Sequence, residues 1–496
     1  MVGEVALKAM QAREEQFVAH AKKIWEHPET AYNEVNTCAV TAELLRELGF
    51  AVETGLYGMP TALRASWGSG APVIGFLGEF DALPGLSQKV STCQEAVQEG
   101  APGEGCGHNL LCVAPLAAAY GLKEELRASG RPGTVVYYGC PAEEALTGKV
   151  FMARGGAFRE LDIAFSWHGG TKNCVMRGVM TGLNSAKFHF VGRTSHAGGA
   201  PENGRSALDA VELMNVGANY LREHVTMDNR IHYVITDGGM APNIVPDKAC
   251  VWYFVRALTR EAVEDTYRRL VLVAEGAAHM TETKVEVEFL GGCYPTLENR
   301  VLSDVLHQSL QEVERPVWTE EELEFAEAIN VQNPNYDQIK RRPDYDGPLG
   351  VGVGIREENG FGSTDVGDVQ HIVPCAEVNT ASWNCAAPGH SWQVTSCAGS
   401  SIGMKGMLYG ARALALTAAK AAAVAQADYT GELERTQQQI DSLQQQLALD
   451  RGEDLARAKI RIEQQYQATL SKTREELDKQ VARGALTRSQ AEALEL

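Results

Sequence analysis

The sequence predicts an α/β protein that carries an inserted α+β unit and a helical C-terminal extension. Short apolar runs at 73–77 and 134–138 are bounded by turns and alternate with expected helices, as in a sheet covered on both faces. Between residues 186 and 290 the expected order becomes strand, helix, strand, strand, helix, strand. After Tyr429 the chain is rich in Gln, Glu, Arg and Leu and contains no proline. These three patterns divide the chain into an α/β part, an inserted α+β unit and a C-terminal extension.

Composition narrows the class of protein. The 496 residues exceed one ordinary domain, and 44% hydrophobic with 22% charged residues is typical of a globular chain without a membrane span. A net charge of −19 argues against nucleic-acid binding. Eleven cysteines without paired spacing fit reduced thiols, and residues 1–24 lack the order of a signal peptide. We therefore expect a cytoplasmic protein with a small-molecule substrate.

The first α/β segment contains the strands that should carry the chemistry. Helices are expected near 4–26, 37–48 and 110–128, and strands near 61–66, 73–79 and 134–139. In an open α/β sheet, ligands bind beyond the carboxyl ends of the strands. We therefore expect functional side chains directly after these strands.

The inserted unit has the order of a ferredoxin-like, split-βαβ fold. Strands are expected at 186–191, 231–236, 249–257 and 285–290, and helices at 206–223 and 260–277. This pattern predicts a lid or dimerisation domain at 185–292, between two parts of a catalytic metal-binding domain at 1–184 and 293–427. In the second part we expect helices at 301–313 and 400–420 and a long polar stretch near 331–362, and within it we expect the glycines of 350–354 to form a loop.

The last segment, 428–496, is predicted to be a helical hairpin or coiled coil. Leu433, Ile440, Leu443 and Leu447 recur at near-heptad spacing, and Arg451-Gly452 could turn the chain. A solvated amphipathic helix without a partner is the alternative.

Four short motifs bring together residue types that bind metals. Cys106-Gly-His108 precedes an expected helix, Glu143-Glu144 follows a strand and a proline, His168 ends another strand, and His390 lies in a glycine turn. One of two adjacent carboxylates can bind a metal while the other takes a proton from an activated water. One cysteine, three histidines and one glutamate are too many ligands for one open tetrahedral ion, but they suit two ions that share a bridging ligand.

These motifs resemble a known family. Gly78–Pro84, Gly105–Asn109, Pro141–Glu144, Thr194–Ala197 and the His390 turn are similar to the co-catalytic metal aminoacylase and carboxypeptidase family, over residues 5–425. Further motifs resemble its p-aminobenzoyl-glutamate hydrolase branch, of the B-subunit type; they are Cys106–Leu111, Gly204–Ala210, Ala241–Val245 and Ser363–Val369. The resemblance implies a mixed-sheet, metallo-aminopeptidase-like catalytic domain.

The resemblance also implies roles for individual residues. Two divalent ions, zinc or manganese, would be held by five residues, with Cys106 or a water as the bridge; the five are Cys106, His108, Glu144, His168 and His390. Glu143 would be the general base and Asp81 would orient a ligand.

The remaining roles fall mostly on the lid. His196 would polarise the scissile carbonyl in the neighbouring subunit, and Asn243 and Arg256 would grip the substrate. At Arg256 a structural salt bridge is an equal alternative. Cys112 stands where some relatives have a histidine, and we expect it to pack rather than bind metal.

Together the motifs predict a metal-dependent amidohydrolase. Its substrate would be an N-acyl or N-aroyl amino acid of the p-aminobenzoyl-glutamate type. A dipeptidase of the same family and a non-catalytic assembly subunit of a hetero-oligomeric hydrolase remain alternatives. We expect a homodimer through the lid, and a higher oligomer if the C-terminal helices associate.

Overall fold

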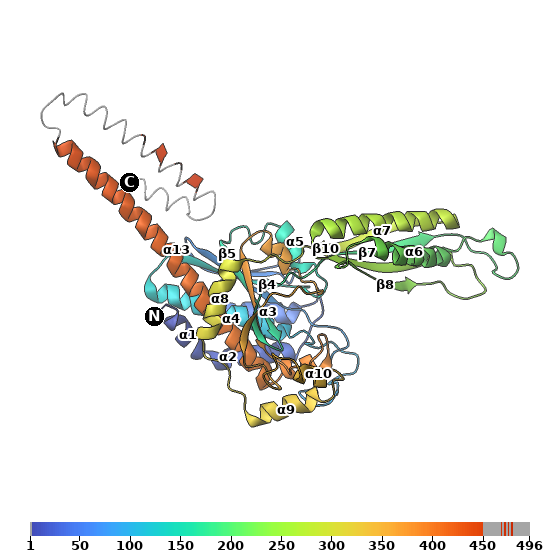
Figure 1. Ribbon diagram of the computed structural model, residues 1–496, viewed down its shortest axis with the longest axis horizontal. Helices are drawn as coiled ribbons and strands as arrows, with labels where there is room; N and C mark the ends of the chain where they lie inside the picture. The colour runs from blue at the N-terminus through green and yellow to red at the C-terminus, as the bar shows by residue number, and fades with distance from the viewer. Residues whose placement is uncertain (1, 450–467, 469–470, 473–474, 476–477, 480–496) are drawn as a thin grey trace.

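The computed structural model describes residues 2–449, 468, 471–472, 475 and 478–479. The body is built on one large sheet, from which a smaller unit and the helix α13 (Ser401–Leu449) project on opposite sides (Figure 1). No helix among these residues has both the length and the apolar character needed to cross a bilayer. The predicted turn at Arg451-Gly452 and most of the predicted returning helix lie outside the described residues.

The large sheet has eight strands with a parallel centre. Its order is β1 (Ala51–Thr54), β2 (Leu63–Ser69), β4 (Gly133–Cys140), β3 (Val73–Glu79), β5 (Ile163–Gly170), β12 (Cys375–Ala381), β6 (Asn173–Met176) and β11 (Val353–Arg356). Strands β4, β3, β5 and β12 are parallel, whereas β2 and β6 run antiparallel to their central neighbours. The carboxyl ends of the four central strands therefore meet at one edge.

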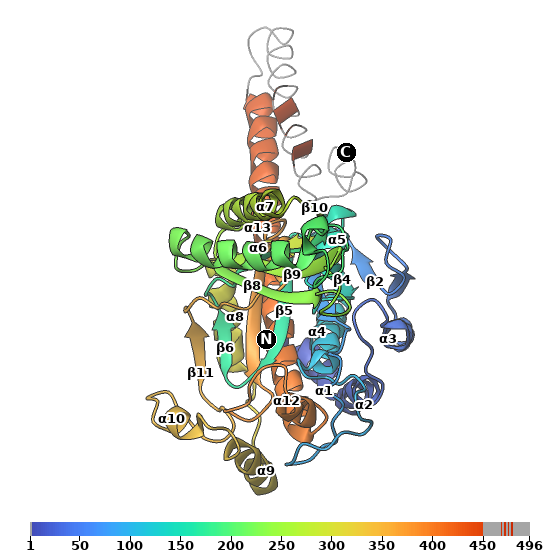
Figure 2. The ribbon, with the colours of Figure 1, turned by 90° about the vertical axis from the view of Figure 1, so that its right-hand side faces the viewer.

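Helices cover both faces of this sheet. One face packs against α4 (His108–Ser129), α8 (Arg300–Glu312) and the first turns of α13, around the buried Trp167 and Tyr409, and α1 (Glu4–Gln11) and α2 (Glu14–Trp25) pack on α4 and α13. The other face meets α5 (Gly148–Arg154) and α11 (Val366–Gln370) around the buried Phe158. Three helices lie at the periphery, α3 (Val35–Glu47), α9 (Glu320–Asn330) and α10 (Tyr336–Lys340) (Figure 2), whereas α12 (Trp392–Ala398) is largely buried and packs against α13.

The smaller unit is a four-stranded antiparallel sheet with two helices on one face. The strand order is β10 (Lys284–Cys293), β7 (Gly182–Val191), β9 (Lys248–Ala257) and β8 (Arg230–Asp237), and the helices are α6 (Ala207–Leu221) and α7 (Arg260–Thr281). A separate apolar core fills the space between helices and sheet. The predicted fold class, a mixed-sheet α/β body with a ferredoxin-like insertion, is confirmed.

The sequence prediction was incomplete at several elements. The expected helix at 4–26 is interrupted at Ala12-Arg13, which separates α1 from α2. The glycines of 350–354 were predicted to lie in a loop, but Gly354 belongs to β11. Helix α10 and strand β11 both lie within the polar stretch 331–362, where no element was predicted. Strand β11 is an edge strand with two glycines in or next to it, so its sequence lacks the apolar pattern by which strands are recognised.

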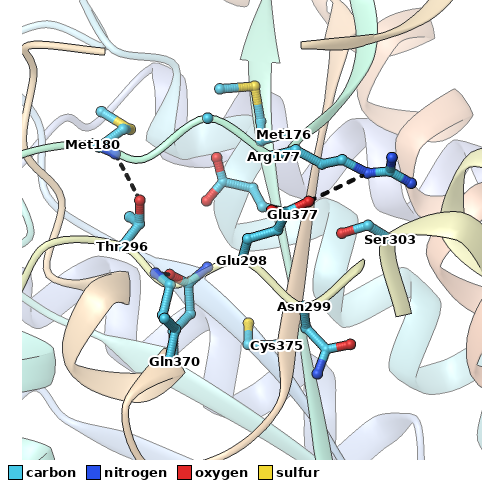
Figure 3. Close-up of a pocket in the computed structure, with 12 residues that line it drawn as sticks. Met176, Arg177, Met180, Thr296, Glu298, Asn299, Ser303, Gln370, Cys375 and Glu377 are labelled. Carbon is cyan, nitrogen blue, oxygen red and sulfur yellow. Dashed lines mark hydrogen bonds and ion pairs between the residues drawn. The ribbon is translucent and has the colours of Figure 1, made fainter. Parts of the chain in front are cut away.

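Two linkers join the small unit to the body and are hydrogen-bonded to each other. The Met180 amide donates to Thr296 Oγ1 at 2.7 Å, and the Thr296 amide donates to the Met180 carbonyl at 3.1 Å. Beside them lies a crevice of about 20 Å³, where Arg177 faces Glu298 at 3.6 Å (Figure 3). The two linkers therefore run side by side where they join the small unit to the body.

Candidate metal centre

The predicted ligands meet where the parallel strands end. Glu144 follows β4, His168 lies near the end of β5, His390 follows β12, and Cys106 and His108 stand at the start of α4. Four of the five line one pocket of about 650 Å³, and His108 lies buried beneath it. The structure thus brings together all five residues that the sequence singled out as ligands.

A glycine allows the Cys106–His108 turn. Gly107 has φ +76°, a left-handed conformation that favours glycine, and α4 begins at the next residue. A Cβ atom at Gly107 would lie 3.0 Å from the ring of Trp383. The turn places the Cys106 thiol and the His108 imidazole within reach of one centre.

Backbone carbonyls fix the tautomers of His108 and His168. The Nδ1–H group of His108 donates to the Asp81 carbonyl at 2.7 Å, and that of His168 donates to the Gly169 carbonyl at 2.6 Å. A carbonyl oxygen can only accept, so Nδ1 carries the proton in both rings. Each Nε2 therefore presents a lone pair to the centre, as a metal ligand requires.

The ligand atoms form two groups that share Cys106. One group is Cys106, His108 and His168, and the other is Cys106, Glu144 and His390; within each, all ligand atoms lie within 4.8 Å of one another. Around a tetrahedral ion with bonds of about 2.0–2.3 Å, ligand atoms lie about 3.3–3.8 Å apart. The Cys106–His168 and Glu144–His390 separations, 3.4 and 3.5 Å, fall in this range.

Two buried atoms of the centre have no hydrogen-bond partner among the described residues. His108 Nε2 and Glu144 Oε1 are inaccessible and accept no hydrogen bond from the residues that the structure describes. Leaving such groups unsatisfied costs free energy, which a bound cation would recover. Burial also raises the pKa of the Cys106 thiol, so the thiolate needs a cation beside it. The donor set therefore fits a pair of metal ions.

Asp81 anchors the turn that carries the two glutamates. Its carboxylate oxygens accept the Glu143 amide at 3.0 Å and the Glu144 amide at 2.9 Å. The preceding residue, Ala142, has φ +54°, a conformation that a non-glycine residue keeps only when its surroundings enforce it. Asp81 therefore holds the turn through its carboxylate, and it holds the His108 ring through its backbone carbonyl.

Glu143 has the environment of a general base. Its carboxylate lies 4.0 Å from His108 Nε2 and forms a cluster with Glu79 and His108. Burial raises the pKa of Glu143 well above its usual range, and the carboxylates of Glu79 and Asp365 act in the same direction. A carboxylate with a raised pKa holds a transferred proton better at neutral pH.

A buried ion-pair network beneath the centre was not predicted. Lys149 Nζ lies 2.5 Å from Glu79 Oε1 and 2.6 Å from Asp365 Oδ1, and all three side chains are buried. Glu79 Oε2 in turn lies 3.2 Å from His108 Nε2. Burial lowers the pKa of Lys149, but Asp365 and Glu79 outweigh burial and raise it. The only sequence signal was the position of Glu79 at the end of an apolar strand.

The three lid residues lie in different places. Arg256 lines the pocket and donates from Nη1 to Ser363 Oγ at 2.8 Å, so the salt-bridge alternative for it finds no carboxylate partner among the described residues. His196 and Asn243 do not line the pocket; they lie on two neighbouring lid loops, after β7 and between β8 and β9, where the Ala197 amide donates to the Asn243 carbonyl at 3.0 Å. Cys112 is buried in the core beside Tyr137.

His196 is held in one tautomer. Its Nδ1 accepts the Gly198 amide at 3.2 Å and the Gly199 amide at 2.9 Å. An atom that accepts from two amides carries no proton, so in the neutral ring the proton is on Nε2. His196 therefore presents an exposed N–H donor.

Comparison with known proteins identifies the family. Residues 180–279 match the peptidase dimerisation domain. The B subunit of p-aminobenzoyl-glutamate hydrolase from Escherichia coli strain K12 is 38% identical over 430 residues, which cover 82% of this chain and 89% of that protein. Mouse Xaa-Arg dipeptidase is 28% identical and covers 82% of this chain and 85% of its own length.

The fold agrees with these relatives. A structure described as a dinuclear metal binding peptidase from the M20 family of Bacillus subtilis superposes with a TM-score of 0.55 at 17% identity, over 83% of this chain and 99% of that one. The resemblance found in the sequence motifs is confirmed. This chain belongs to the M20 peptidases, a family of amide-bond hydrolases, in the branch that contains the B subunit of p-aminobenzoyl-glutamate hydrolase.

Proposed function

We propose that this chain hydrolyses the amide bond of an N-acyl or N-aroyl amino acid of the p-aminobenzoyl-glutamate type. The observation that carries the proposal is the pair of ligand groups that share Cys106, with Glu143 beside them. The similarity to p-aminobenzoyl-glutamate hydrolase supports the choice of substrate. We also propose the division into a catalytic unit at 1–184 and 293–427 and a lid at 185–292.

We assign five residues to two divalent ions, with Cys106 in both ligand groups. Cys106, His108 and His168 would hold one ion, and Cys106, Glu144 and His390 the other. Thiolate and imidazole ligands favour zinc, whereas carboxylate and imidazole also suit manganese. Such a pair supplies a Lewis acid for the scissile carbonyl and lowers the pKa of a bound water.

The reaction itself would use Glu143. In our proposal its carboxylate takes a proton from the attacking water and returns it to the leaving nitrogen. The Asp81 carboxylate keeps Glu143 in position through the backbone. The guanidinium of Arg256 lines the same pocket and suits the carboxylate of the amino acid product.

We further propose that a homodimer completes the site through the lid. Strand β8 is an edge strand that exposes Tyr233, Val234 and Ile235, and helix α6 exposes Val216 and Tyr220 on one side. An edge strand with exposed apolar side chains invites pairing with a second copy. His196, which does not line the pocket of its own chain, would donate its Nε2–H to the carbonyl oxygen of a substrate in the neighbouring subunit.

A substrate panel tests the proposal. It contains p-aminobenzoyl-glutamate, hippurate, N-acyl aspartates and simple dipeptides, with bound metal measured on each sample. We expect the highest kcat/KM for p-aminobenzoyl-glutamate, and we expect Glu143→Gln to keep its metal but lose about 10²–10⁴-fold in kcat. Failure to cleave any member with zinc or manganese would contradict the proposal.

A dipeptidase is the second candidate, because the Xaa-Arg dipeptidase relative covers the same share of this chain. Higher kcat/KM for a basic dipeptide than for p-aminobenzoyl-glutamate would favour it. An assembly role without catalysis is disfavoured, since all five ligands and the base are present.

A further inference from the structure

One acidic side chain in the pocket has no role in the reaction described above. Glu377 lies in the middle of β12 and lines both the catalytic pocket and the crevice beside the linkers. No hydrogen bond or ion pair to its carboxylate is present within the part of the chain that the structure describes. The neighbouring carboxylates are different, because Glu79 is paired with Lys149, and Asp81 with two backbone amides.

The strand register places Glu377 close to the metal ligands. Residue 379 on β12 stands directly opposite His168 on β5, and Glu377 stands opposite Ser166. Side chains two residues apart on a strand point to the same face, about 6.6 Å apart. Both Glu377 and Asn379 therefore face the pocket, and Glu377 lies one such step from the row that contains His168.

The same row shows why Glu377 has no basic partner. Met176 on β6 stands between Glu377 on β12 and Arg356 on β11, so Arg356 is two strands away. Arg177, next to Met176, points away from the Glu377 carboxylate and toward Glu298 (Figure 3). Glu377 thus lies on the floor of the pocket as an acceptor that a ligand can reach.

The electrostatics agree with this geometry. Burial, together with the charge of Glu79, raises the pKa of Glu377 to about 7, against the opposing effects of Lys149 and Arg356. A partly buried carboxylate without a partner is unfavourable, and a ligand N–H group would relieve this cost. An anionic ligand group at the same place would be repelled.

We propose that Glu377 binds an amino group on the acyl part of the substrate and thereby selects amine-bearing acyl groups. The inference rests on the proposed amidohydrolase function and names the residue behind its substrate choice. The carboxylate of the amino acid product belongs at Arg256, which also lines the pocket. The acyl group is left to face Glu377. An aromatic ring between the carbonyl and the amine would span the distance from the row that contains His168 to the row that contains Glu377.

Three matched substrates test the proposal: p-aminobenzoyl-glutamate, benzoyl-glutamate and p-carboxybenzoyl-glutamate. In the wild type we expect kcat/KM to fall about 10- to 100-fold when the amine is removed, and further when a carboxylate replaces it. In Glu377→Leu we expect the kcat/KM values for p-aminobenzoyl-glutamate and benzoyl-glutamate to differ by no more than about threefold. In Glu377→Gln we expect the p-carboxybenzoyl substrate to be cleaved better than by the wild type, because the repulsion is gone. Glu358→Gln, the same change at an exposed side chain outside the pocket, should keep the wild-type ratios.

A binding measurement keeps this test separate from that of the proposed function. Calorimetry compares p-aminobenzoate with benzoate on metal-loaded wild type and Glu377→Leu, and circular dichroism confirms that the variant is folded. Tighter binding of p-aminobenzoate to the wild type alone supports the role of Glu377, even if no substrate of the panel is cleaved. Equal preference in wild type and Glu377→Leu, in binding or in kcat/KM, overturns the inference while leaving the amidohydrolase proposal intact.

Discussion

Replacing Lys149 by methionine should destabilise the catalytic unit strongly. Lys149 Nζ contacts both Glu79 and Asp365, and the lysine and aspartate side chains are completely inaccessible. Methionine has nearly the same length but no charge, so the variant leaves two buried carboxylates without a cation. Breaking a buried ion pair by removing one partner typically costs about 3–5 kcal/mol.

The titration of the carboxylates sets an independent limit on this loss. A stranded carboxylate can bind a proton, which costs about 1.36 kcal/mol for each pH unit above its unfolded pKa near 4. At pH 7 this amounts to about 4 kcal/mol for each carboxylate. In the variant the folded state would bind more protons than the unfolded state, so the deficit should shrink as the pH falls from 7 toward 5.

Urea unfolding of the metal-free protein, followed by tryptophan fluorescence at pH 7 and pH 5, measures both effects. The control is Lys172→Met, which removes an exposed ion pair with Asp344 and should cost less than about 1 kcal/mol. If Lys149→Met is no less stable than this control, or if its deficit does not change with pH, the network does not bear the charges that we assign to it.

Three further predictions concern assembly, metal and acid stability. Mixing His196→Ala with Glu143→Gln, each inactive alone, should restore about a quarter of wild-type activity, because half of the randomly formed dimers are mixed and each has one intact site; no recovery after subunit exchange would place His196 outside the neighbouring site. Cys106→Ala should lower the bound metal, measured by elemental analysis, toward zero, whereas His390→Ala should remove only one ion, since Cys106 belongs to both ligand groups; equal losses would argue against a bridge. Burial lowers the pKa of His20 to about 4, so the unfolded state binds more protons below about pH 6.5, and the free energy of unfolding should fall by about 3 kcal/mol between pH 7 and pH 4. In His20→Gln, the free energy of unfolding measured by urea titration should decrease less between pH 7 and pH 4, by about this amount. An unchanged dependence on pH would show that His20 is not buried in its neutral form.

The sequence predicts what depends on local pattern. The apolar strands, the glycine turn at Cys106 and the carboxylates after β4 are each visible within a few residues, and the parallel sheet then brings them to one edge. Strand β12 was not predicted, since Cys375–Ala381 mixes polar and small residues. Without that strand, the row that contains Glu377 could not be recognised.

The contacts that depend on long-range packing could not be predicted. Lys149 meets Glu79 across 70 positions and Asp365 across 216, and nothing in the local sequence of Lys149 or Asp365 indicates this meeting. The Asp81 carbonyl that binds His108 is a backbone atom, which no side-chain pattern reveals. The roles of Asp81 and His108 could be inferred from residue type, but the atoms involved required the fold.

The two adjacent rows of β12 have a consequence for how such proteins diverge. Asn379 faces the metal ligands, while Glu377, one pleat away, faces the part of the pocket that would receive the acyl group. Both rows share one backbone, so a mutation at 377 or at the neighbouring 176 alters the chemistry offered to a new compound and leaves the ligand atoms where they are. Proteins that descend from one ancestor can therefore acquire different substrate specificities through single codon changes, while each of them keeps the inherited reaction.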